Sequence, residues 1–309
     1  MLTRRAALAS VGVAAILLVM KAGALWQTES VAMLGSLADT ALDLVASLVT
    51  LFGVRLAAMP ADQEHRYGHG KAEALTSLFQ VSIISVAAAG IAIESFSRIG
   101  NPHLTRSAET GIGVSIIAIL LSFGLIAYQR HVVARTGSLA INTDAMHYKS
   151  DFFLNMSVIV ALVLDHFLRL HGVDALFGIA IAAWLGWGAW HSASEAIGHL
   201  MDREWSLEER QRFIEVAARH PALHGIHDMR TRTSGADRFV QFLVWVDPDM
   251  TVRAAHDVMD EVEAQLKIEF PGVDILIHPD PDGHIEGGGN PLRAREAGEV
   301  LREESTPRN

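Results

Sequence analysis

The sequence of 309 residues contains no cysteine, which excludes disulfide bonds and thiolate metal sites. Charged residues are also scarce, at 19% of the chain, whereas 50% of the residues are hydrophobic and the mean hydropathy is +0.26. An ordinary soluble domain carries about 25% charged residues, so this composition predicts an integral membrane protein. Any bound metal must then be held by imidazole, carboxylate, carbonyl or water, and the 15 histidines supply imidazoles for such a site.

Basic residues are in the minority: 25 Lys and Arg stand against 35 Asp and Glu, which gives a net charge of −10. Most of this negative charge lies after residue 200. An acidic end of this kind argues against nucleic acid as a partner.

The N-terminus has Arg4 and Arg5 ahead of an apolar run, a pattern that also occurs in twin-arginine and secretory signals. No small-x-small cleavage site follows at the usual place, and further apolar segments lie behind it. We therefore predict a first membrane helix that is retained.

Windows of about 20 apolar residues predict a membrane domain of six helices. They fall at residues 8–26, 33–56, 74–93, 110–128, 139–164 and 175–196. Most basic residues flank one side of these spans, namely Arg4, Arg5, Arg55, Arg66, Lys71, Arg130, Arg135 and Arg203, against Arg98, Arg106 and Arg169 on the other. The positive-inside rule then places both termini in the cytoplasm.

After residue 201 the pattern changes to that of a soluble α+β domain. We expect a helix at 207–219, strands at 225–233 and 238–246 around a Ser-Gly turn, a helix from Thr251 to about 268, and a strand at 273–278. Beyond residue 279 the chain is Gly-rich and then charged. We therefore predict a membrane domain over 1–202, a cytoplasmic domain over 203–283 and a disordered tail over 284–309.

Two short motifs place acidic and histidine side chains inside apolar spans. They are Asp39-Thr-Ala-Leu-Asp43 and His147-Tyr-Lys-Ser-Asp151, and in each motif the outer residues share one helix face because they are four apart. An ionised Asp at mid-membrane costs about 2.5–3.5 kcal/mol, which a bound cation or protons would offset. Two helices that each offer such a pair supply the four ligands of a tetrahedral N/O site for Zn²⁺ or a similar ion.

The alternative for this quartet is a purely structural one, in which the side chains form interhelical hydrogen bonds or salt bridges, with Lys149 as a candidate partner.

A second cluster lies in the loop between the second and third spans, where Asp62, His65 and His69 are spaced to wrap one ion. Exposed loops are also rich in such residues for solubility alone. A third set, His227, His256, His278 and Asp280, is spread over the cytoplasmic domain, and scattered histidines of this kind are often ordinary surface or core residues.

The motifs together resemble the cation diffusion facilitator family, and specifically its bacterial zinc/iron exporter branch. The resemblance is most specific in residues 39–43, 60–73, 147–151 and 227–232, and it extends from the first span to about Pro281. It implies a homodimeric Zn²⁺/H⁺ antiporter with a six-helix membrane domain and a cytoplasmic domain of metallochaperone-like αββαβ fold.

The resemblance also implies roles for single residues. Asp39, Asp43, His147 and Asp151 match the transport site, and Asp62, His65 and His69 match a loop site. His227, His256, His278 and Asp280 match ligands of a binuclear site at the cytoplasmic dimer interface, and Lys71 and Asp202 match a charge pair that locks the two protomers together at the membrane lipid surface.

One position departs from the family pattern: the chain has Leu243 where the defining family member has a further His on the second strand. Leu cannot bind a metal. Three alternatives stay open for the cytoplasmic site: one ion, two weakly held ions with water completing the shell, or a structural clamp.

The predicted function is efflux of a divalent metal ion across the inner (cytoplasmic) membrane by proton antiport. A His ligand favours Zn²⁺, with Cd²⁺ and Fe²⁺ behind it, and disfavours Mn²⁺. We do not expect an enzyme, because the sequence has no His-Glu-x-x-His and no spare intramembrane acid beside the quartet to act as a general base. A membrane metal sensor that does not transport is the alternative.

Overall fold

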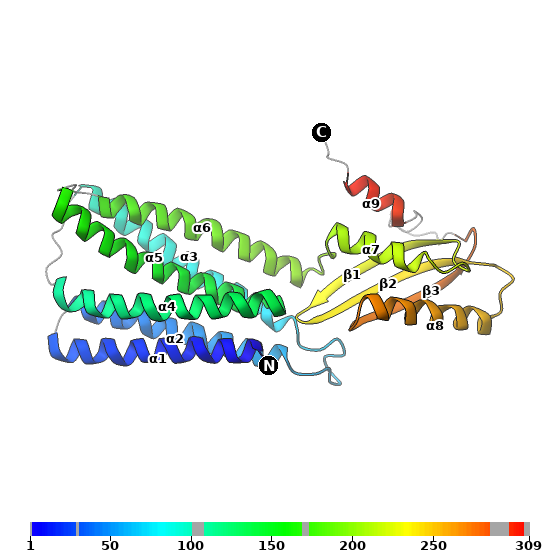
Figure 1. Cartoon of the computed structure of the whole chain (residues 1–309), viewed down its shortest axis with the longest axis horizontal. Coiled ribbons are helices and arrows are strands. Elements are labelled where there is room, and N and C mark those ends of the chain that lie inside the picture. The colour runs from blue at the N-terminus through cyan, green and yellow to red at the C-terminus, as the bar shows by residue number, and fades with distance from the viewer. Residues whose placement is uncertain (1, 29–30, 101–107, 169–172, 285–296, 306–309) are drawn as a thin grey trace. The chain divides into compact units, whose positions relative to one another are not determined.

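A computed structural model of the chain describes all residues except 1, 29–30, 101–107, 169–172, 285–296 and 306–309. The chain divides into two compact units, residues 1–200 and 201–309. The first unit is built from helices alone, and the second combines helices with a small sheet (Figure 1).

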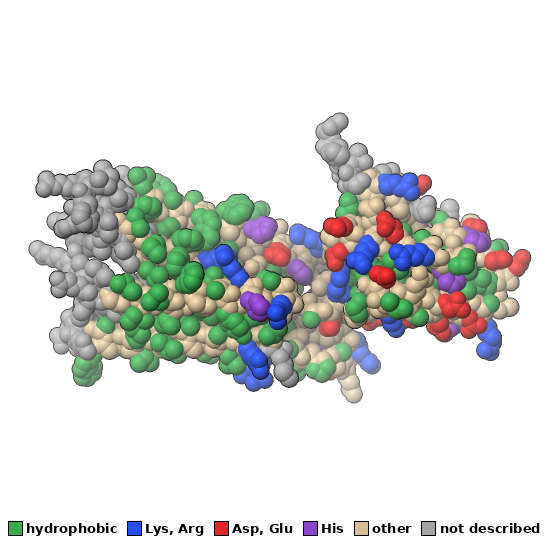
Figure 2. All heavy atoms as spheres, in the orientation of Figure 1, with side chains coloured by type: hydrophobic (Ala, Val, Ile, Leu, Met, Phe, Trp, Pro, Cys, Tyr) green, Lys and Arg blue, Asp and Glu red, His purple; other side chains and the backbone are tan. Residues whose placement is uncertain are grey.

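The described residues of the first unit form six long helices. They are α1 (Leu2–Thr28), α2 (Val31–Ala57), α3 (Ala72–Gly100), α4 (Ala108–Thr136), α5 (Leu139–Leu168) and α6 (Val173–Leu200). Helix α3 packs along α6, α1 along α2, and α4 along α5. Figure 2 shows hydrophobic side chains over much of the visible surface of this unit, as helices that face lipid require.

Four stretches among the described residues are long and apolar enough to cross a membrane. They lie in α1 to α4, at Leu2–Trp26, Asp39–Ala57, Ala72–Ser97 and Ile116–Thr136. Helices α5 and α6 contribute none of these four stretches within the described residues. The helices are those that the sequence predicts, whereas the count of six membrane spans stays a prediction.

Small residues let these helices approach each other closely. A Cβ atom added to Gly178 on α6 would overlap Ser95 on α3, and one added to Gly53 on α2 would overlap Thr76 on α3. Close approach of this kind increases the van der Waals contact on which helix association in a membrane depends.

The second unit has the element order helix, strand, strand, helix, strand that the resemblance implies. Its elements are α7 (Leu207–Ala217), β1 (Gly225–Ser234), β2 (Asp237–Val246), α8 (Val252–Glu269) and β3 (Val273–Pro281). The sheet order is β1-β2-β3, with β1 antiparallel and β3 parallel to β2. Gly235, at a φ of 62°, provides the left-handed residue in the tight β1–β2 turn.

The helix starts follow from local chemistry. Thr251 is the N-cap of α8, as predicted, and its side chain accepts a hydrogen bond from the Ala254 N–H at 3.2 Å. Ser206 caps α7 in the same way through the Glu209 N–H, also at 3.2 Å.

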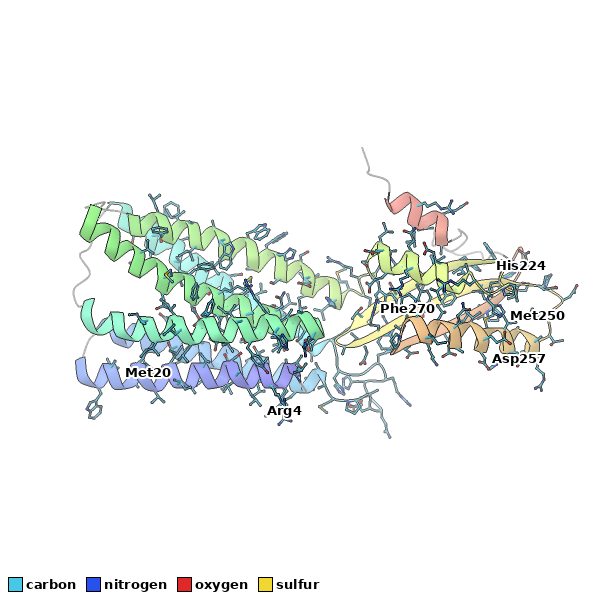
Figure 3. All side chains as sticks on the ribbon, in the orientation of Figure 1. Arg4, Met20, His224, Met250, Asp257 and Phe270 are labelled. Atoms are coloured by element: carbon cyan, nitrogen blue, oxygen red, sulfur yellow. The ribbon has the colours of Figure 1, made fainter. Side chains whose placement is uncertain are left out.

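The core of this unit lies between the helices and one face of the sheet. Phe213 on α7 packs against Phe242 on β2 and Phe270 at the end of α8, with ring centroids 5.4 and 5.1 Å apart. Phe270 is labelled in Figure 3. The other face of the sheet bears half-buried Leu243 and Trp245 on β2. Polar side chains on β1 and β3 can therefore gather beside them.

The C-terminal segment differs from the predicted disordered tail over residues 297–305. The structure forms a helix there, α9 (Ala297–Ser305), which contacts α7 and β1. Ala297 and Leu301 are four residues apart and are 6% and 5% exposed, so one apolar face is buried, whereas Glu299 and Arg302 are exposed. The remaining tail residues, 285–296 and 306–309, lie outside the described residues.

We predict that Phe213→Ala destabilises the second unit by about 3–5 kcal/mol, because it removes a fully buried ring that contacts two others. Hydrogen exchange of the β2 amides in the full chain measures this loss. Ile268→Ala, at a side chain that is 80% exposed, should change the same protection by less than about 0.5 kcal/mol. Equal protection in the two variants would contradict the core described above.

Candidate metal centres

Helices α2 and α5 bring three of the predicted intramembrane ligands together. His147 Nε2 on α5 lies 3.0 Å from Asp43 Oδ1 on α2 and 3.9 Å from Asp151 Oδ2 on α5. One ligand atom from each of the three residues lies within 4.8 Å of the others. His147 is 6% exposed, and both acids are half-buried. This intramembrane triad is an N/O donor set of the kind that suits Zn²⁺ and similar divalent ions.

The fourth predicted ligand, Asp39, is not part of this group. It lies one helical turn before Asp43 on α2 and is exposed. Lys149, the candidate partner in the purely structural alternative, forms no ion pair with these acids in the described part of the chain. The contact between His147 and Asp43 is itself an interhelical hydrogen bond, so metal binding and helix packing use the same atoms.

Asp144 is a buried acid for which the sequence predicted no role, and it overturns the expectation that no spare acid lies beside the quartet. It lies on α5, three residues before His147, and its side chain is completely buried. Ser10 Oγ on α1 donates to its Oδ2 at 2.6 Å, and Gln129 Nε2 on α4 donates to the same oxygen at 2.7 Å. The sequence signal for Asp144 was its position as an acid within an apolar span, because such residues need partners inside the bundle.

The loop between α2 and α3 brings all three of its predicted ligands together. His65 Nδ1 lies 3.3 Å from Asp62 Oδ1, and His69 Nε2 lies 3.4 Å from Asp62 Oδ2. The three ligand atoms lie within 4.8 Å of one another. Gly68, at a φ of 76°, makes the left-handed turn that returns the chain toward His65.

Backbone hydrogen bonds hold the carboxylate of this loop in place. The N–H groups of His65 and Glu64 donate to Asp62 Oδ1 at 2.6 and 2.9 Å. The His65 N–H, aided by the Glu64 N–H, lowers the pKa of Asp62 below its ordinary value. These bonds therefore order the loop at neutral pH, and their contribution disappears as the pH falls through the lowered pKa.

In the second unit, Asp280 lies between two of the predicted histidines on the helix-free face of the sheet. Its Oδ1 is 3.2 Å from His278 Nε2 on β3, and its Oδ2 is 3.4 Å from His227 Nε2 on β1. Asp280 Oδ2 is buried and has no hydrogen-bond partner among the described residues. A buried carboxylate oxygen of this kind, flanked by imidazoles, fits a metal ligand.

A bulge in β1 sets the position of His227. The register shifts between His227 and Arg230, and Asp228 has a φ of 45° there. The Arg230 guanidinium donates twice to the Asp228 carboxylate, at 3.1 and 2.8 Å, and so fixes the bulge. The ring of His227 stacks on Trp245 with centroids 4.4 Å apart, which fixes its orientation.

The structure does not bring His256 to this pair of histidines. Its Nδ1 lies 3.2 Å from Asp260 Oδ2 on the same helix, α8, and the residue is exposed. Leu243 is the cross-strand neighbour of both His227 and His278. The apolar side chain therefore occupies the strand position between the two histidines.

Lys71 belongs to the first unit and Asp202 to the second. Lys71 Nζ donates to the carbonyl oxygen of Leu200 at 3.3 Å. Asp202 has a φ of 54°, and its carboxylate lies 4.0 Å from Arg232 Nη1. Their pairing across protomers stays a prediction.

Two family models match the chain. The model described as the cation efflux transmembrane domain matches residues 7–201, and the model described as the cation efflux protein cytoplasmic domain matches residues 205–282. Together they extend over both units of the structure.

The curated relatives that match are similar along nearly their whole length. The cation-efflux pump FieF of Yersinia enterocolitica is 40% identical over 280 residues, covering 91% of this chain and 93% of the relative. The cation-efflux pump FieF of Yersinia pestis (strain Pestoides F) is 39% identical over 278 residues, covering 90% and 92%. Among solved structures, the metal-bound C-terminal domain of the CzcD transporter from Thermotoga maritima is 28% identical, with a TM-score of 0.24, and covers 25% of this chain and 93% of its own.

We predict that Asp62→Asn raises the dissociation constant of Zn²⁺ at the loop at least about tenfold, because the charge is lost while Asn still accepts the two backbone hydrogen bonds. Calorimetry on the full chain with His147, His227 and His278 replaced by Ala isolates this site. Glu64→Gln removes a neighbouring charge outside the cluster and is the matched control. An equal loss in both variants would mean that general loop charge, rather than a ligand set, attracts the metal.

Proposed function

The chain belongs to the cation efflux family, and on that basis we propose that it exports a divalent metal ion, preferably Zn²⁺, across the cytoplasmic membrane in exchange for protons. It is a multi-pass membrane transporter of cations. The proposal includes the preferred ion, the counter-ion, the six spans with cytoplasmic termini and the ligand residues.

The observation that carries the proposal is the intramembrane triad of Asp43, His147 and Asp151. Within the described residues it is the one group of three metal-type ligands inside the helical unit's long helices, and it lies between two of them. Two carboxylates and one imidazole favour Zn²⁺, and Cd²⁺ and Fe²⁺ to a lesser degree, over Mn²⁺, which suits oxygen ligands. Asp39 on the adjacent turn of α2 would complete a fourth position when the helices move.

His147 provides the exchange between metal and proton. Its Nε2, the atom nearest both acids, carries either a proton or a metal ion but not both. A cytoplasm-facing site therefore releases protons as the metal binds. When rearrangement of the helices opens the site to the other side, a higher proton activity protonates the ligands and displaces the metal.

The membrane potential makes this coupling necessary. Export of two positive charges against 100 mV, inside negative, costs about 4.6 kcal/mol. Each proton that returns recovers about 2.3 kcal/mol, in addition to the contribution of the pH gradient. Exchange with protons can thus drive export where simple release cannot.

The cytoplasmic unit supplies dimerisation and metal sensing in this proposal. Asp280, His227 and His278 would hold a Zn²⁺ ion. The charge of this ion would offset the repulsion between the acidic cytoplasmic units of the two protomers. His256 would join from the dimer interface, and Lys71 and Asp202 would pair the protomers near the membrane. Because Leu243 stands where the family pattern has a further His ligand, we propose one tightly held ion per protomer.

We predict that Asp43→Ala abolishes Zn²⁺ flux into proteoliposomes that hold an imposed pH gradient, because it removes the carboxylate nearest to His147. Asp39→Ala, one turn away and outside the triad, should retain a measurable fraction of the wild-type rate. Flux measured for Zn²⁺, Cd²⁺, Fe²⁺ and Mn²⁺ ranks the substrates. Flux of no ion through the wild type, despite tight binding, would favour a metal sensor, and flux through Asp43→Ala would remove the triad as the transport site.

We also predict that His278→Ala reduces the Zn²⁺ dependence of dimer formation, because one of the two imidazoles beside Asp280 is lost. Analytical ultracentrifugation with and without Zn²⁺ measures this. The control is His224→Ala, at an exposed His that pairs with Asp282 at 3.1 Å outside the proposed ligand set. An unchanged Zn²⁺ response of the His278 variant would contradict the cytoplasmic site.

A further inference from the structure

Asp144 forms a hydrogen-bonded hub that joins α5 to the four preceding helices. In addition to Ser10 on α1 and Gln129 on α4, Gln80 Nε2 on α3 donates to Asp144 Oδ1 at 3.0 Å, and Thr50 Oγ1 on α2 lies 3.4 Å from the same oxygen. Gln80 also donates to Thr50, and Gln129 donates to Ser10 at 3.0 Å. We call these five residues the Asp144 hub. Each of them is 1% exposed or less.

The donors of the hub are arranged for an ionised carboxylate. Both oxygens of Asp144 accept hydrogen bonds from hydroxyl or amide groups, and these bonds stabilise the ionised form of the carboxylate. Within the described residues, Asp144 forms no ion pair with a Lys or Arg. Its negative charge is therefore stabilised by hydrogen bonds and is available to attract a cation nearby.

The hub lies next to the intramembrane triad along α5. Asp144 is three residues before His147, and it attracts a positive charge on that ring. Immediately after His147, the hydroxyl of Tyr148 donates to the Ser10 carbonyl oxygen at 3.0 Å and lies 2.9 Å from Ser47 Oγ on α2. His147 is thus held between two residues that both fasten α5 to Ser10 on α1.

We propose that Asp144 is a positioning residue for cation binding: it directs His147 toward Asp43 and adds a fixed negative charge that raises the affinity of the triad without contacting the ion. This inference rests on the proposed transport function. Asp144 therefore contributes to the affinity for the ion and does not coordinate it. Its oxygens instead accept hydrogen bonds from the other hub residues.

The substitution Asp144→Asn separates the effect of charge from that of hydrogen bonding. Gln80 Oε1 and Gln129 Oε1 are buried and have no hydrogen-bond partner in the described structure. Rotation of either amide would let its oxygen accept from an Asn side-chain N–H, so the hub can persist when its charge is removed.

The experiment is Zn²⁺ flux into proteoliposomes with an imposed pH gradient, with KM and maximal rate determined separately. We expect Asp144→Asn to raise KM at least about tenfold, because it removes one charge near a divalent ion in a poorly screened environment, and to leave a measurable maximal rate. Ser77→Ala removes a buried hydroxyl that has no hydrogen-bond partner among the described residues, and it serves as the matched control. An unchanged KM in Asp144→Asn overturns the proposal.

Two further results separate an effect of charge from direct coordination of the ion. Ser10→Ala keeps the charge but removes a hydrogen bond to it, and it should raise KM about twofold to fourfold. If Asp144→Asn does not fold, an unchanged KM in Ser10→Ala overturns the proposal instead. Complete loss of flux in a folded Asp144→Asn would make Asp144 a ligand, and normal flux in Asp43→Ala would mean that the transport site itself is elsewhere.

Discussion

Carboxylates inside an apolar helix bundle must be stabilised, and this requirement shapes the helical unit. Each ionised Asp near the membrane centre costs about 2.5–3.5 kcal/mol unless hydrogen bonds or a cation offset the cost. The chain meets the requirement in two ways along α5. Asp144 is surrounded by donors from four other helices, whereas Asp43 and Asp151 converge on His147 and leave their remaining coordination for a cation.

This division of roles explains how a bundle can be both stable and able to release its cargo. The hub is satisfied by the protein itself and holds its shape when no metal is bound. The intramembrane triad is only partly satisfied by the His147–Asp43 hydrogen bond, so its most favourable state includes a divalent ion or protons. The same logic recurs outside the membrane helices, where Asp62 and Asp280 are each placed between two histidines.

The sequence predicted the features that repeat along one element. The spacing of four between His147 and Asp151 identified a helix face, and a Ser-Gly turn between two strand segments identified the β1–β2 hairpin. The Asp144 hub was missed because its donors are single polar residues on separate helices, which no local pattern connects. The α9 helix was missed because its burial depends on α7 and β1, which lie far from it in the sequence. Likewise, Asp39 shares a face with Asp43 by spacing, but only the path of α5 decides which of the two meets His147.

The measurement that tests the central claim most directly is zinc X-ray absorption spectroscopy on the full chain with the loop and cytoplasmic histidines replaced by Ala. We predict one imidazole nitrogen and two or three carboxylate or water oxygens at about 2.0–2.2 Å around Zn²⁺, and loss of the bound ion in Asp43→Ala. An all-oxygen shell, or an unchanged spectrum after Asp43→Ala, would contradict a transport site formed by Asp43, His147 and Asp151.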